Sequence, residues 1–178
     1  MGAFSVRWIY ELDTDASLSL APYLQHPLNQ PLSFRDRDGR EWLVLYPSGR
    51  AVIRAGYAWD GCTPKFSLFD IVLGVPDGIP NEFTRKPKAY HASLVHDALY
   101  QFLDLSEFPV SRRGADQAFL DLLDRDAFAP RYLYWAVVRV FGGLSHRVTR
   151  RVRDNAGRCV PLPVGAAEPP ASFRPTDL

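Results

Sequence analysis

Two segments of the sequence place ionisable side chains where helical periodicity expects apolar ones. A helix advances about 100° per residue, so one apolar stripe is expected in residues 92–103; it consists of Ala92, Val95, Leu99, Phe102 and Leu103. His96 projects into this stripe, Tyr100 follows one turn later on the same side, and Asp97 lies at the edge of the stripe. We therefore expect a largely buried histidine with a tyrosine hydroxyl close to it.

The second segment, residues 112–125, carries Asp116 inside an apolar sector. This sector consists of Ala115, Phe119, Leu122 and Leu123, with Leu120 at its edge, whereas Gln117, Asp121 and Asp124 point the other way. A carboxylate in apolar surroundings costs several kcal/mol unless it is hydrogen-bonded or neutralised. His96 is the partner that we expect for Asp116.

A buried histidine and aspartate in contact can activate water. The carboxylate accepts a hydrogen bond from one ring nitrogen, fixes the tautomer, and leaves the other nitrogen basic. A second interpretation is a structural network of His96, Asp116 and Tyr100 that ties two helices together without chemistry. A third takes His91 and the doublet His96-Asp97 as part of a metal-dependent phosphohydrolase. The residues alone leave these interpretations open.

A loop of glycines and polar residues ends an alternating strand at residues 56–65. Asp60 and Asp97, together with loop carbonyls such as that of Gly61, would supply the hard oxygen ligands that calcium takes. The alternative is that Asp60-Gly61 is simply a tight turn, because Asp-Gly is a common turn dipeptide.

The order of these motifs resembles a family of small phage and prophage proteins of unknown function. The motifs are Gly-Tyr-Ala-Trp-Asp-Gly-Cys-Thr-Pro, His-Asp-Ala-Leu-Tyr, Arg-Arg-Gly-Ala-Asp-Gln-Ala-Phe and Val-Arg-Val-Phe-Gly-Gly, within about residues 50–145. The resemblance implies a phage or prophage protein located in the bacterial cytoplasm or in the virion. A non-enzymatic virion, tail or assembly component with phage protein partners is one function that it implies.

A His-Asp-x-x-Tyr helix followed by an Ala-Asp-x-x-Phe helix is also similar to the catalytic core of phospholipase A2, especially the minimal versions in parvovirus capsids. This resemblance implies that His96 is the base that activates water and that Asp116 orients it. It further implies Tyr100 as a supporting hydrogen-bond donor and Asp97 as a calcium ligand. The implied activity is calcium-dependent, esterase-type hydrolysis with phospholipid or another ester as substrate.

Length and composition limit the number of domains and the kinds of protein that this chain could be. With 178 residues, of which 47% are hydrophobic, the chain can bury a single core. We expect one domain over residues 1–160 and a flexible tail, rich in Pro and Ala, over residues 161–178. The two cysteines, Cys62 and Cys159, make a reducing compartment the default. We predict no signal peptide and no membrane span, and a net charge of +1 gives no general attraction to nucleic acid.

The elements that must position the candidate residues follow from pattern and turn signals. Strands are expected in residues 4–11 and 32–57, including a hairpin of residues 32–35 and 41–46 around Asp36-Arg37-Asp38-Gly39 and a turn at Pro47-Ser48-Gly49. Residues 64–87 form a long connection with a short helix at 66–73. Helices are expected at 88–103, at 112–125 with Ser111 as its cap, and at 130–154 with an interruption at Gly142-Gly143. The result is an α+β fold, a small N-terminal antiparallel sheet followed by a three-helix half that carries the His-Asp helix pair.

Overall fold

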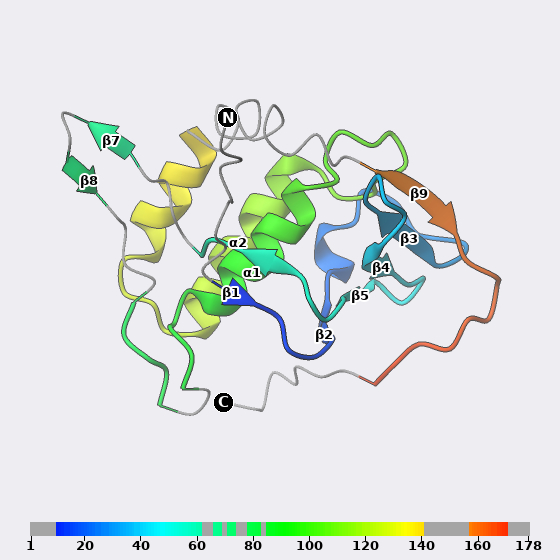
Figure 1. Ribbon diagram of the computed structural model, residues 1–178, viewed down its shortest axis with the longest axis horizontal. Coiled ribbons are helices and arrows are strands. Elements are labelled where there is room, and N and C mark those ends of the chain that lie inside the picture. Colours follow the sequence, from blue (N-terminus) through cyan, green and yellow to red (C-terminus); the bar gives the residue numbers. More distant parts are fainter. Residues whose placement is uncertain are drawn as a thin grey trace, which may run out of the picture.

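The computed structural model describes residues 10–61, 66–68, 71–73, 78–82, 85–140 and 157–170. The architecture is α+β, as predicted: an antiparallel sheet lies on one side of helix α1 (Tyr90–Tyr100), and helix α2 (Arg112–Arg125) packs against α1 (Figure 1). None of the helices in these ranges is long and apolar enough to cross a membrane.

The main sheet has five strands. Their order is β2 (Ala16–Ser19), β5 (Arg50–Ile53), β4 (Glu41–Leu45), β3 (Leu32–Arg35) and β9 (Arg158–Pro161), and every neighbouring pair is antiparallel. The predicted hairpin is confirmed as β3 and β4. Its turn is held by Asp36, whose carboxylate accepts hydrogen bonds from the amide of Arg40 at 2.9 Å and from Nε1 of Trp42 at 2.7 Å. The predicted turn at residues 47–49 is also confirmed, with Gly49 at φ +83°.

One prediction for this half of the chain needs correction. Residues 66–73 do not form a helix; they contain the antiparallel pair β7 (Phe66–Leu68) and β8 (Ile71–Leu73). Phe66 in the first segment and Ile71 and Val72 in the second are aromatic or β-branched residues, which favour short strands over a helix of that length. The predicted strand at 4–11 is described only from residue 10, where β1 (Tyr10–Glu11) pairs with β6 (Ala58–Trp59). Strands β2 and β9 were not predicted, and β6 lies within residues 56–65, which were predicted to be a loop.

The first two helices lie close to their predicted positions. α1 is shorter than the expected 88–103, and α2 has the expected bounds, with Oγ of Ser111 accepting the hydrogen bond of the Gly114 amide at 3.1 Å. A third helix is described over residues 131–140. Its predicted continuation to residue 154, with Gly142-Gly143, lies outside the described residues.

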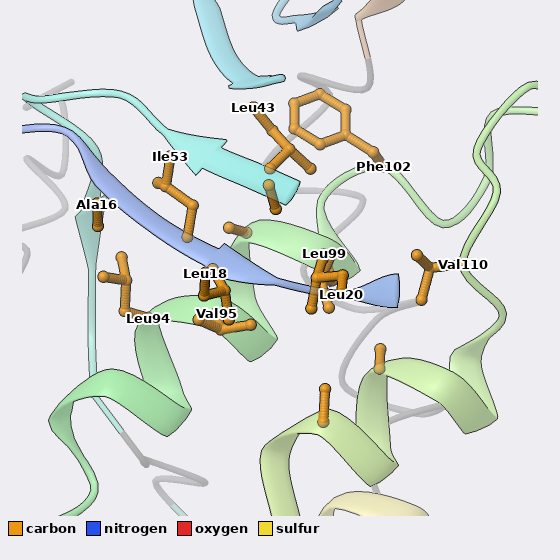
Figure 2. Close-up of a cluster of buried hydrophobic side chains, with 14 of the residues drawn as sticks. Ala16, Leu18, Leu20, Leu43, Ile53, Leu94, Val95, Leu99, Phe102 and Val110 are labelled. Atoms are coloured by element: carbon orange, nitrogen blue, oxygen red, sulfur yellow. The ribbon is translucent and has the colours of Figure 1, made fainter. Parts of the chain in front are cut away.

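Helix α1 lies between the sheet and α2, and every one of its residues except Asp97 is buried. Figure 2 shows Leu18 of β2 and Ile53 of β5 beside Leu94, Val95 and Leu99 of α1. Burial of each large apolar side chain of this kind contributes about 1.5–3 kcal/mol. Because these residues occupy the side of α1 that faces the sheet, His96 and Tyr100 lie on the side that faces α2.

The chain continues from β9 along the sheet. Residues 162–170, part of the predicted tail 161–178, are in extended or turn conformation. They contact β2, β5 and the end of β4, and Oγ of Ser17 donates to the carbonyl of Pro170 at 3.3 Å. Residues 171–178 lie outside the described part of the chain.

Candidate active site

The predicted histidine and aspartate are in contact between α1 and α2. Nε2 of His96 lies 3.2 Å from Oδ1 of Asp116. The hydroxyl of Tyr100 donates a hydrogen bond to the same oxygen, and the rings of His96 and Tyr100 lie 4.0 Å apart between centroids. Asp116 is fully buried and His96 is 8% exposed. The structure therefore brings His96, Tyr100 and Asp116 together.

The contact defines which nitrogen of His96 is basic. A carboxylate accepts hydrogen bonds and does not donate them, so the proton of the neutral imidazole is on Nε2, which faces Asp116. Nδ1 then carries the lone pair. The charged group on that side is the carboxylate of Asp97, whose Oδ1 lies 3.9 Å from Nδ1 and whose side chain is 28% exposed. Nδ1 is thus the nitrogen available to accept a proton.

Two arginines that sequence reasoning missed complete the site. Nη1 of Arg139, in helix 131–140, donates to Oδ2 of Asp116 at 2.9 Å. Nε of Arg112 donates to the hydroxyl of Tyr100 at 3.2 Å, and its Nη2 donates to the carbonyl of Arg139 at 2.6 Å. Arg139 lies in the apolar run Tyr-Trp-Ala-Val-Val-Arg-Val. The criterion that selected Asp116, an ionisable residue in an apolar helix, would also have selected Arg139.

These contacts raise the pKa of His96 and lower the pKa of Asp116. Burial disfavours the imidazolium, but the hydrogen bonds and negative charges of Asp116 and Asp97 outweigh it and raise the pKa of His96. Burial would also raise the pKa of Asp116, but hydrogen bonds from three neighbouring side chains lower it below its usual value. Asp116 therefore remains ionised at neutral pH, where it can stabilise a protonated His96.

Tyr100 acts only as a neutral hydroxyl near neutral pH. Burial and the hydrogen bond to Asp116 raise its pKa far above the usual value of 10.0. Its proton consequently stays in the hydrogen bond to Asp116, while its oxygen accepts from Arg112. The tyrosine therefore contacts the carboxylate as a neutral hydroxyl donor.

The chain matches no protein-family model, no curated protein and no solved structure. The assignment of the site therefore depends on the geometry of these residues.

The predicted calcium loop is described only in part. Asp60 and Gly61 follow directly after β6, with Gly61 at φ +73°, and residues 62–65 lie outside the described chain. β6 contacts α1 through Trp59, whose Nε1 donates to Oγ of Ser93, one turn before Asp97, at 3.1 Å. Within the described ranges, no group of three or more His, Cys, Asp or Glu side chains could hold a metal ion. Neither Asp60 nor Asp97 therefore belongs to such a group in this part of the chain.

His91 belongs to a different contact between the same helices. Its Nδ1 lies 3.6 Å from Oδ2 of Asp126. Arg125 donates through Nε to Oδ1 of the same carboxylate at 3.0 Å and through Nη2 to Oδ2 at 3.2 Å. Burial would raise the pKa of Asp126, but the hydrogen bonds of His91 and Arg125 lower it. In the described residues, His91 and His96 are thus engaged by two separate aspartates.

Proposed function

We propose that this protein is an esterase-type hydrolase, resembling phospholipase A2, that acts on phospholipid or a related ester with His96 as its general base. One observation carries the proposal: Nε2 of His96 lies 3.2 Å from the buried carboxylate of Asp116, so its basic Nδ1 faces away from that carboxylate. A fixed tautomer and a buried, ionised orienting group are what general-base catalysis by histidine needs.

The mechanism that this geometry supports has one proton shuttle. Nδ1 of His96 takes a proton from water as the water oxygen attacks the ester carbonyl, and the ionised Asp116 stabilises the imidazolium that forms. The same nitrogen then returns the proton to the leaving alcohol. Only neutral His96 can begin the cycle, so the rate is expected to rise with pH through the raised pKa of this residue.

Asp97 is the residue that we propose as a calcium ligand. Its carboxylate is 28% exposed and lies beside Nδ1 of His96, which suits an ion placed next to the reacting carbonyl. Calcium takes about 6–8 oxygen ligands, and waters and backbone carbonyls can be among them. The carboxylate of Asp97 could therefore be the single acidic ligand of a site whose other ligands are mostly waters. The bound ion would polarise the ester carbonyl and stabilise the developing oxyanion.

The proposal is tested by hydrolysis of mixed phospholipid vesicles with calcium and with a chelator. Wild type should release fatty acid in calcium, and His96→Gln should reduce the rate by about 10²–10⁴-fold, the usual contribution of a general base. His26→Gln is the matched control because His26 is exposed on another part of the chain. Asp97→Asn should keep the fold and lose the response to calcium.

The proposal fails if folded wild type releases no fatty acid from vesicles and cleaves no short-chain ester in either condition. It also fails if His96→Gln hydrolyses as fast as wild type. Circular dichroism of each variant separates loss of chemistry from loss of fold.

A second candidate function is that of a non-enzymatic phage component, in the virion or its assembly. The contacts of Arg139 favour it, because Asp116 of α2 is bound by side chains from α1 and from helix 131–140. A buried charge that joins three helices is typical of a structural network. This function predicts that His96→Gln lowers stability, by about 1–3 kcal/mol for a partner left without its hydrogen bond, and that no hydrolysis occurs.

A further inference from the structure

Helix 131–140 turns its charged residues inward and an apolar face outward. Nε of Arg131 lies 2.8 Å from Oδ1 of Asp124, and Nη1 of Arg139 donates to Asp116, so both arginines contact α2. Surface helices usually show the reverse, with apolar residues toward the core and charged residues toward water. The outward side of this helix is therefore unusual for a surface that contacts only water.

The outward side forms one continuous apolar stripe. Its members carry no charge and recur at helical spacing; they are Tyr132, Leu133, Ala136, Val137 and Val140. Tyr132 is 62% exposed, Leu133 65% and Val140 70%, whereas Tyr134 on the inward side is buried. Single exposed apolar residues are ordinary, but a contiguous patch of them marks a surface that contacts another apolar body.

The stripe lies at one end of the molecule and close to the candidate site. Helix 131–140, drawn in yellow in Figure 1, lies at the end of the long axis opposite β9. The inward side of the same helix reaches the site through Arg139, which contacts Asp116. Only the thickness of this helix therefore separates the stripe from the site.

The size of the stripe favours a lipid surface over a second copy of this chain as its occupant. A stable interface between proteins typically uses about 20–30 residues on each side, and the stripe offers five. A bilayer, by contrast, accepts a single row of apolar side chains from a helix that lies in its interface. Tyr132 has an amphipathic ring of the kind that is enriched at the level of the lipid headgroups.

The sequence that follows the helix indicates which kind of lipid. Residues 141–153 contain no Asp or Glu and four arginines, Arg147, Arg150, Arg151 and Arg153. A basic stretch joined directly to a bound helix stays within reach of the same surface, and each arginine near an anionic bilayer strengthens binding. An apolar helix face followed by such a stretch is complementary to anionic lipid.

We propose that the outward stripe of helix 131–140 docks this protein onto an anionic lipid surface. Tyr132, Leu133 and Val140 enter the boundary between headgroups and acyl chains, while Arg131 and Arg139 keep their contacts with α2. Docking itself needs no catalysis. Only its consequence rests on the proposed function: if phospholipid is the substrate, docking holds the candidate site beside it.

Vesicle sedimentation tests the docking without hydrolysis. The full chain is mixed, in chelator, with vesicles of phosphatidylcholine alone or of phosphatidylcholine and phosphatidylglycerol in equal amounts. Wild type should bind the anionic vesicles at least about ten times more tightly than the neutral ones, because the arginines act only on the anionic surface. Raised salt should weaken binding to the anionic vesicles. These measurements use wild type alone and so do not depend on the folding of any variant.

Substitutions then locate the docking surface. Leu133→Gln should weaken binding to the anionic vesicles by about tenfold or more, because it removes one large apolar side chain from the lipid. Val140→Gln should also weaken it. Val164→Gln is the matched control, since Val164 is 81% exposed on the segment that follows β9, and it should bind as wild type does. Circular dichroism checks that each variant is folded.

Several results would overturn the docking. They are failure of folded wild type to bind the anionic vesicles, equal binding to both kinds of vesicle, and equal effects of Val140→Gln and Val164→Gln. A dimer in analytical ultracentrifugation that Leu133→Gln dissociates would also overturn it, because a second copy would then cover the stripe. Vesicle binding without any hydrolysis would support the docking and count against the proposed function. If hydrolysis occurs, Leu133→Gln should cleave a short-chain ester in solution at the wild-type rate.

Discussion

The hydroxyl of Tyr100 donates to Oδ1 of Asp116, the oxygen that Nε2 of His96 also contacts. Tyr100→Phe removes this donor from a buried carboxylate and should lower the free energy of unfolding by about 1–3 kcal/mol. Urea denaturation measures the loss. Tyr132→Phe is the control, since Tyr132 is 62% exposed, and its effect should stay within about 0.5 kcal/mol. Equal effects of the two substitutions would contradict the buried hydrogen bond.

Asp116→Asn should be the most destabilising single change at the site. It removes a fully buried negative charge that faces His96 and Arg139. Removal of one partner of a buried ion pair typically costs about 3–5 kcal/mol. Thermal and urea unfolding should both show the loss, and a cost below about 1 kcal/mol would mean that the carboxylate is not the centre of the network.

The stability that His96 contributes should depend on pH. Its pKa is raised in the folded protein above the ordinary 6.5, so the folded state binds the proton more tightly than the unfolded chain does. This contribution is complete below pH 6.5 and is lost as the pH rises through the folded-state pKa. The difference in unfolding free energy between wild type and His96→Gln should therefore shrink toward alkaline pH. A difference that grows with pH would mean that the pKa of His96 is lowered and not raised on folding.

Arg139 should couple energetically to Asp116. Arg139→Met keeps the length of the side chain but removes the contact of 2.9 Å to Oδ2. Because the arginine side chain is 37% exposed, solvent screens part of its charge, and we expect a loss of about 1–2 kcal/mol. A double-mutant cycle with Asp116→Asn should show non-additivity. Arg113→Met, at an exposed site on α2, supplies the control, and additivity in the cycle would argue against the contact.

The part of the site that the sequence predicted is the part set by local periodicity. His96 and Tyr100 are one helical turn apart, so their common face follows from spacing alone. Asp116 was found because an apolar sector around a carboxylate requires a buried partner. The approach of Arg139 depends instead on how helix 131–140 packs, and no local pattern specifies that packing.

The strands also divide into those that local sequence signals predict and those whose position depends on packing with distant parts of the chain. The β3–β4 hairpin is local, and Asp36 and Gly39 mark its turn. β9 is four residues long, is at most half-buried, and pairs with β3 at a great distance along the chain. Neither alternation nor a turn signal marks so short a strand, and only the unpaired edge of β3 determines where it lies. The helix expected at 66–73 is wrong for a related reason, because periodicity does not separate a short helix from short apolar strands.

The pairing of β3 with β9 sets the order in which the sheet can be completed during synthesis. Leu32 to Arg35 lie opposite Pro161 to Arg158, so the ribosome makes one partner long before the other. Until residues 158–161 emerge, the outer backbone groups of β3 are open to any extended chain nearby, and an open edge of this kind is a template for aggregation. Formation of the helices does not cover this edge of β3 in the nascent protein. The edge is covered only after β9 has been synthesised and pairs with it.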